Sequence, residues 1–105
     1  MVSKSVIETV QRYLSELRKY GVQIDKVFLF GSQARGTAGK ESDIDVMLVS
    51  SLFDQDRMKY IGKIWVATEV SNFKIEPHVV GLKRFLEDDY SPLIGIVKKE
   101  GIEIN

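Results

Sequence analysis

The amino-acid sequence predicts one α/β domain in which helices flank a small mixed sheet. Two observations lead to this fold class. Segments with helical hydrophobic spacing alternate along the chain with short apolar runs that are typical of strands. No repeat, low-complexity tract or linker interrupts the 105 residues. We therefore expect residues 1–105 to form a single domain.

The first half of the chain predicts one helix and two strands. Apolar residues recur every three or four positions over residues 3–20, which predicts a helix, and Gly21 supplies its stop signal. The runs at residues 25–30 and 43–50 are typical of strands. Alternation along the second strand places Asp45 on the face opposite to Ile44.

The second half predicts three helices and two further strands. Helical spacing returns over residues 54–70, and residues 73–81 form an apolar, strand-like segment. Residues 82–89 and 91–101 predict two short helices. Residues 102–104 predict a small terminal strand.

Composition excludes several classes of protein. The 15 basic residues are balanced by 15 acidic ones, which disfavours a nucleic-acid partner, because backbone binding needs a basic surface. No apolar run approaches the roughly 20 residues that span a bilayer, so no membrane partner is expected. The chain has no cysteine, and its start lacks the pattern of a signal peptide. We therefore expect a cytoplasmic protein.

The connections between strands predict how they pair. The segment 31–42 is short and favours an antiparallel pair, whereas the helical segment 54–70 suits a right-handed parallel connection. Both pairings bring the candidate site residues to the same end of the sheet. These residues are Gly31, Ser32, Asp43, Asp45 and Glu76.

The residue types at this sheet end point to phosphate and metal chemistry. Gly31 allows close approach to the backbone, and Ser32 is expected to cap a helical turn over residues 33–35 whose free N–H groups favour an anion. Asp43 and Asp45 share a strand face and can converge on a hard divalent cation. A phosphate cradle beside carboxylates indicates metal-assisted phosphoryl or nucleotidyl transfer.

Each of these features has a more ordinary interpretation when taken alone. A Gly-Ser pair after a strand is usually a turn, and an Asp-x-Asp at a strand start is more often solvated than metal-binding. Arg35 and Glu76 would by default be surface residues. His78, on the same strand face as Glu76, is more often a hydrogen-bonded structural residue than a ligand.

Taken together, the motifs resemble a known family. "GSQARG", then "SDIDVMLV", then the later "KIEPHVVG" resembles the minimal nucleotidyltransferases (the antitoxin type) of the DNA polymerase β superfamily. The resemblance covers nearly the whole chain. It implies the palm-like nucleotidyltransferase fold of that superfamily.

The resemblance also implies a role for each site residue. Gly31 and Ser32 would hold the triphosphate of ATP, with Arg35 steadying its phosphates. Asp43 and Asp45 would bind two Mg²⁺ ions. Glu76 would be the third carboxylate, which binds one metal and helps to deprotonate the attacking hydroxyl. Family members more often have aspartate there, and glutamate is one methylene longer.

The resemblance implies an enzyme that transfers AMP from ATP to a protein hydroxyl. The expected acceptor is a tyrosine of a helical HEPN-type toxin, so that the protein acts as an antitoxin within a homo- or hetero-oligomer. The alternative is a non-catalytic nucleotide-binding module that neutralises the helical partner by contact. A small-molecule adenylyltransferase is disfavoured, because the chain has no evident acceptor domain.

Overall fold

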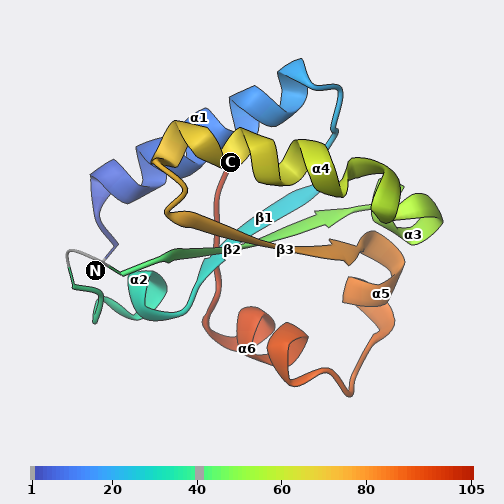
Figure 1. The fold of residues 1–105 in the computed structure, drawn as a ribbon. Coiled ribbons are helices and arrows are strands. Elements are labelled where there is room, and N and C mark those ends of the chain that lie inside the picture. The colour runs from blue at the N-terminus through green and yellow to red at the C-terminus, as the bar shows by residue number, and fades with distance from the viewer. Residues whose placement is uncertain (1, 40–41) are drawn as a thin grey trace.

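A four-stranded mixed sheet with helices on both faces forms the fold (Figure 1). The computed structural model describes residues 2–39 and 42–105. The strands follow the order β3-β2-β1-β4 across the sheet. Their bounds are β1 Lys26–Phe30, β2 Ile44–Ser50, β3 Ile75–Gly81 and β4 Ile102–Glu103. The predicted fold class, a mixed sheet flanked by helices, is confirmed.

The helices form two layers. On one side α1 (Lys4–Lys19) and α4 (Met58–Val66) lie over the sheet, and on the other lie α5 (Leu82–Glu87) and α6 (Pro92–Glu100) (Figure 1). The remaining helical segments are α2 Ser32–Arg35, α3 Leu52–Asp56 and the 3₁₀ turn η1 Ala67–Ser71. No helix in the described part of the chain is long and apolar enough to cross a membrane.

The sequence explains the first helix closely. Four of its apolar residues are buried on one face: Val10, Tyr13, Leu14 and Leu17. The helix ends where Gly21 takes a left-handed φ of 78°. Backbone N–H groups of Gly21 and Val22 then donate to Arg18 and Leu17, which satisfies the last carbonyls. The predicted stop at Gly21 is confirmed.

Strand pairing follows the predicted scheme. β1 runs antiparallel to β2 with Phe30 opposite Asp45, and β2 runs parallel to β3 with Asp45 opposite Glu76. β4 adds a short antiparallel pair to β1. This register places the start of β2, the start of β3 and the end of β1 at one end of the sheet.

The single helix predicted over residues 54–70 is wrong in detail. The structure has three pieces there: α3, α4 and η1. The Asp56 side chain accepts a hydrogen bond from the Lys59 N–H at 3.2 Å, which starts a new turn between α3 and α4. Asn72 and Phe73 then take left-handed φ values of 56° and 62°, so β3 begins at Ile75 rather than at residue 73.

The sheet has one hydrophobic cluster on each face. The larger one joins α1, α4 and η1 to Val46, Leu48 and their neighbours. The smaller one joins α5 and α6 to Met47, Val49 and Val80. Because side chains alternate along a strand, Asp45, Glu76 and His78 lie on the face of the smaller cluster.

Candidate active site

Three side chains from β2 and β3 form a compact group at the predicted end of the sheet. Asp45, Glu76 and His78 each offer one ligand atom, and these atoms lie within 4.8 Å of one another. Asp45 and Glu76 are opposite each other in the parallel register. His78 follows two residues after Glu76 on the same strand face. Glu76 is exposed, whereas Asp45 and His78 are partly buried.

The carboxylate of Asp45 lies between His78 and Gly31. Its Oδ1 atom is 3.6 Å from His78 Nε2. A Cβ atom at Gly31 would come within 2.5 Å of Asp45 Oδ2. Gly31 also has φ 73° and ψ −152°, a backbone region that side chains rarely allow. Glycine at position 31 therefore leaves room for the Asp45 carboxylate.

His78 differs from the structural histidine that the sequence favoured. Its Nε2 atom is buried and makes no hydrogen bond within residues 2–39 and 42–105, and the 3.6 Å separation from Asp45 Oδ1 is too long for one. The ring packs edge-on against Phe30, with centroids 5.2 Å apart. The interpretation as a hydrogen-bonded histidine is therefore wrong for Nε2. The sequence signal that His78 lies near Glu76 was their separation of two residues, which puts both side chains on one strand face.

Asp43 lies apart from this group. It precedes β2, is exposed, and is not among the described residues whose ligand atoms converge. The structure thus brings together Asp45 and Glu76 of the three predicted carboxylates and leaves Asp43 at the solvent-facing start of the strand.

The Gly-Ser turn forms a short helix beside Asp45. Gly31 occupies the N-cap position, and Ser32 is the first residue of α2, so the prediction that Ser32 caps the turn is wrong. The reason is the unusual backbone of Gly31, whose carbonyl already accepts the Arg35 N–H at 3.1 Å. Ser32 instead accepts the Thr37 N–H through its carbonyl, at 3.0 Å.

Arg35 ends α2 and forms an ion pair with Glu100 of α6. The two charged groups are 3.6 Å apart, and both side chains are about half exposed, at 51% and 41%. An exposed pair of this kind contributes about 0–1 kcal/mol. The pair with Glu100 therefore holds Arg35 only weakly.

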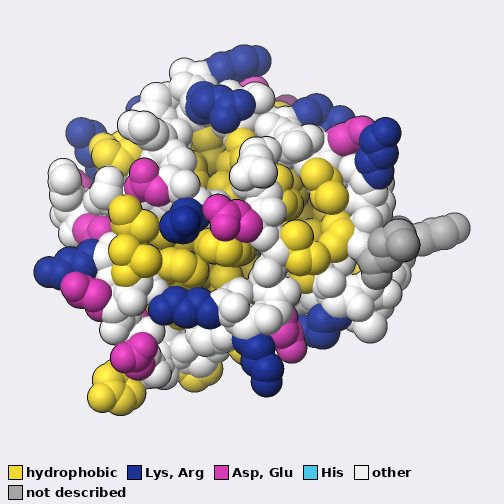
Figure 2. Space-filling model, turned by 180° about the vertical axis from the view of Figure 1, so that it is seen from behind, with side chains coloured by type: hydrophobic (Ala, Val, Ile, Leu, Met, Phe, Trp, Pro, Cys, Tyr) yellow, Lys and Arg dark blue, Asp and Glu magenta, His cyan; other side chains and the backbone are white. Residues whose placement is uncertain are grey.

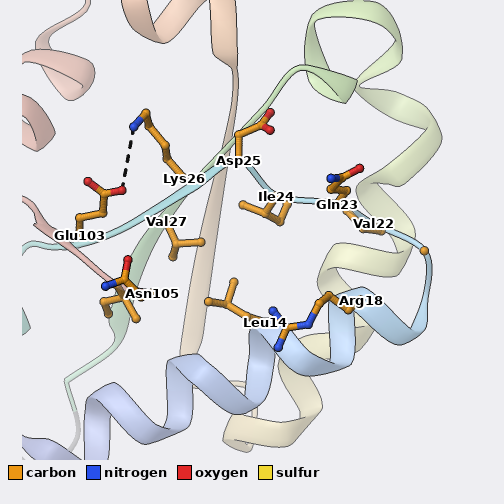
Figure 3. A pocket seen from close by; sticks show the side chains of 12 residues that line it. Leu14, Arg18, Val22, Gln23, Ile24, Asp25, Lys26, Val27, Glu103 and Asn105 are labelled. Carbon is orange, nitrogen blue, oxygen red and sulfur yellow. Dashed lines mark ion pairs between the residues drawn. The ribbon is translucent and has the colours of Figure 1, made fainter.

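A larger hollow in the described part of the chain lies away from this group. It has a volume of about 630 Å³ and lies beside the first residues of β1, Lys26 and Val27. Figure 3 shows Leu14 and Val27 directed into it and the Lys26–Glu103 ion pair at its edge. Asp45 is opposite Phe30, at the other end of β1. Among the described residues, the converging ligand atoms belong to Asp45, Glu76 and His78, none of which lines this hollow.

A smaller groove of about 270 Å³ does reach the group. It follows β3, the edge strand on that side of the sheet, and includes His78 in its wall. Its other walls come from α4, α5 and α6, including Trp65, Arg84 and Ile94. Of the group, the groove is lined by His78, whereas Glu76 is exposed at the open sheet end.

Residues 7–104 match the family of the nucleotidyltransferase domain. The chain belongs to this family. A relative from Methanocaldococcus jannaschii, named "Putative protein adenylyltransferase MJ0604", is 39% identical over 46 residues. That match covers 43% of this chain and 46% of the relative, so the chain matches less than half the length of this curated relative.

The fold is also similar to a solved structure. A "putative nucleotidyltransferase" from Sulfolobus solfataricus superposes with a TM-score of 0.61 at 17% identity, covering 94% of this chain and 78% of that one. The nucleotidyltransferase family expected from the order of the Gly-Ser and Asp-x-Asp motifs is confirmed. Membership implies a nucleotide substrate and a divalent metal.

Proposed function

We propose that this nucleotidyltransferase transfers AMP from ATP to a hydroxyl group on another protein. The observation that carries the proposal is the parallel register of β2 and β3, which places Asp45 beside Glu76 next to the Gly31–Ser32 turn. The relative named as a protein adenylyltransferase supports a protein acceptor.

The donor atoms of the group fit a divalent cation. Asp45 and Glu76 supply carboxylate oxygens, the preferred ligands of Mg²⁺. The buried Nε2 atom of His78 is a further ligand atom, and it makes no hydrogen bond to the residues that the structure describes. A metal bound here would neutralise charge on phosphate oxygens and on the leaving pyrophosphate. We assign a second ion, brought by the nucleotide, to the side of Asp43.

The remaining residues bind and orient the reactants. Gly31 and Ser32 would hold the triphosphate against α2, with Arg35 releasing Glu100 to contact it. Glu76, the exposed carboxylate, would accept the proton of the attacking hydroxyl. A bond then forms between that oxygen and the α-phosphorus, the bond to the β-phosphate oxygen breaks, and pyrophosphate leaves.

The acceptor in this proposal is a tyrosine of a helical HEPN-type toxin, which makes the protein an antitoxin. Exposure of Glu76 and Asp43 supports an acceptor that arrives on another molecule. A tyrosine hydroxyl suits this chemistry because its pKa, near 10, is far below that of an aliphatic hydroxyl.

Intact-mass spectrometry tests the proposal. The protein is mixed with the helical protein encoded beside it, ATP and Mg²⁺, and the neighbour should gain one or more AMP units. Asp45→Asn should abolish the gain in mass. Glu103→Gln should not, because Glu103 lies on β4 and its carboxylate pairs with Lys26 of β1. Neutralisation of the toxin without a mass change, by wild type and Asp45→Asn alike, would favour the non-catalytic binding module.

A further inference from the structure

We infer that His78 is a ligand of the metal, together with Asp45 and Glu76, and that it gives the site a preference for Mn²⁺ over Mg²⁺. The inference rests on the proposed function, because it concerns the ion that the transfer reaction uses. It adds a nitrogen ligand to a site that was expected to hold metal through carboxylates alone.

The first step is the position of the ring nitrogen. His78 Nε2 lies 3.6 Å from Asp45 Oδ1 and belongs to the same 4.8 Å group as Glu76. Two ligands that share one ion at about 2.1 Å lie roughly 3.0–3.4 Å apart for bond angles between octahedral and tetrahedral. The observed separation is therefore close to that of two ligands of one cation and too long for a hydrogen bond.

The second step is that Nε2 makes no hydrogen bond to any residue that the structure describes. The atom is buried, and its neighbour Asp45 Oδ1 is too far away to accept a hydrogen bond. Folded proteins generally avoid leaving a buried polar group in that state. The ring packs edge-on against Phe30. A cation held by Nε2 and Oδ1 would satisfy both atoms.

The third step concerns which cation fits. Mg²⁺ prefers oxygen ligands and retains several waters, whereas imidazole binds transition metals more strongly. A site with one imidazole and two carboxylates therefore binds Mn²⁺ more tightly than a site with carboxylates alone. The imidazole increases the affinity for Mg²⁺ less. Removing the imidazole should lower the affinity for Mn²⁺ more than the affinity for Mg²⁺.

The sequence makes a direct test available. His78 is the one histidine of the chain, so an imidazole signal on a bound metal identifies the ligand without mutation. Mn²⁺ is added to the untagged protein, with and without a non-hydrolysable ATP analogue, and electron spin-echo spectroscopy records coupling to nitrogen. Wild type should show imidazole nitrogen coupling. The ATP analogue alone with Mn²⁺ gives the nucleotide background.

Affinity measurements complete the test. His78→Leu should remove the nitrogen coupling and weaken Mn²⁺ binding by about tenfold or more, the scale on which even indirect ligand partners act. Mg²⁺ binding should change by less than about threefold. His78→Asp should recover Mn²⁺ affinity without nitrogen coupling. Glu103→Gln, which removes a carboxylate outside the group, should match wild type.

The outcomes separate this inference from the proposed function. Mn²⁺ that binds in an Asp45-dependent way without nitrogen coupling would overturn the role of His78 and leave the carboxylate site standing. Absence of any Asp45-dependent binding of Mn²⁺ or Mg²⁺, with nucleotide present, would overturn both. The spectrum of wild type decides the matter even if His78→Leu fails to fold.

Discussion

Among the single residues of the site, Gly31 is the one whose position most clearly requires glycine. Its backbone angles are rarely open to other residues, and a Cβ there would meet Asp45 Oδ2. We expect Gly31→Ala to cost about 1–3 kcal/mol of folding free energy. It should also rotate Asp45 away from Glu76, so that metal-dependent ATP binding falls. Urea unfolding and calorimetric titration measure the two effects.

Gly62 provides the matched control for this substitution. It lies inside α4, and a Cβ there would meet no atom within 4 Å. Gly62→Ala should leave ATP binding unchanged and stabilise the protein by about 0.5–1 kcal/mol. Gly31→Ala with the nucleotide affinity of wild type would contradict the role given to Gly31.

Asp43 and Asp45 should respond differently to substitution, because only Asp45 lies in the converging group. Without nucleotide, Asp45→Asn should abolish Mn²⁺ binding and Asp43→Asn should leave it within about threefold of wild type. With ATP and the acceptor protein, both variants should lose transfer activity. Equal loss of nucleotide-free Mn²⁺ binding in both variants would refute the separate positions assigned to them.

The sequence could predict part of this site. Loop lengths and side-chain alternation were enough to bring Gly31, Asp45 and Glu76 together, because strand register follows from local rules. The pairing of Arg35 with Glu100 joins residues 65 positions apart, and local patterns carry no signal for it. Likewise, the missing hydrogen bond of His78 depends on the surrounding packing.

At the level of whole elements, the sequence predicted the helices and strands better than their junctions. The helical spacing after β2 was correct, but the break near Arg57 depends on one side-chain hydrogen bond from Lys59 to Asp56. A side-chain hydrogen bond of this kind offers the backbone N–H an alternative to the helical hydrogen bond. The spacing of hydrophobic residues gives no information about it.

A buried hydrogen bond joins α1 to α4 and supports an element-level prediction. Tyr13, buried at the centre of α1, donates its hydroxyl to the Ile64 carbonyl at 2.8 Å. Tyr13→Phe removes this buried hydrogen bond and should cost about 0.5–1.5 kcal/mol of unfolding free energy. Urea unfolding at pH 7 measures the loss. Tyr90→Phe, at a site that is 94% exposed, should cause none.

The same tyrosine predicts a loss of stability in alkali. Burial raises the pKa of Tyr13 above its ordinary value of 10.0. The unfolded chain therefore releases this proton first, and stability falls as pH rises above about 10. The fall between about pH 9 and pH 11 should be smaller in Tyr13→Phe than in wild type. Identical pH profiles would show that Tyr13 does not contribute to the alkaline loss.

Across the whole molecule, the two faces of the sheet serve different purposes. The larger hydrophobic cluster closes the face under α1 and α4, while the smaller cluster under α5 and α6 leaves the sheet end with Asp45 and Glu76 uncovered. Figure 2 shows that hydrophobic side chains also gather in the middle of the rear face, with charged side chains among them. The larger hydrophobic cluster and the candidate site thus lie on opposite faces of the sheet.

This division predicts how ligands change the stability of the whole chain. A cation and an ATP analogue that bind only the folded site should add about 2.7 kcal/mol at a concentration of 100 times Kd. For a domain of this size, that corresponds to a rise in Tm of very roughly 10–20 °C. Differential scanning calorimetry measures the rise, which should be larger with cation and nucleotide together than with either alone.

Two variants show whether this stabilisation arises at the proposed site. Asp45→Asn should lose most of the rise in Tm, because it removes a ligand from the converging group. Glu103→Gln should keep all of it, because Glu103 lies on β4, at the opposite edge of the sheet from β3, and its carboxylate pairs with Lys26. If Asp45→Asn retained the full rise, cation and nucleotide would be binding elsewhere. The hollow of about 630 Å³ beside Lys26 and a second one of about 570 Å³ beside Gly39 and Ile44 would then be the places to examine.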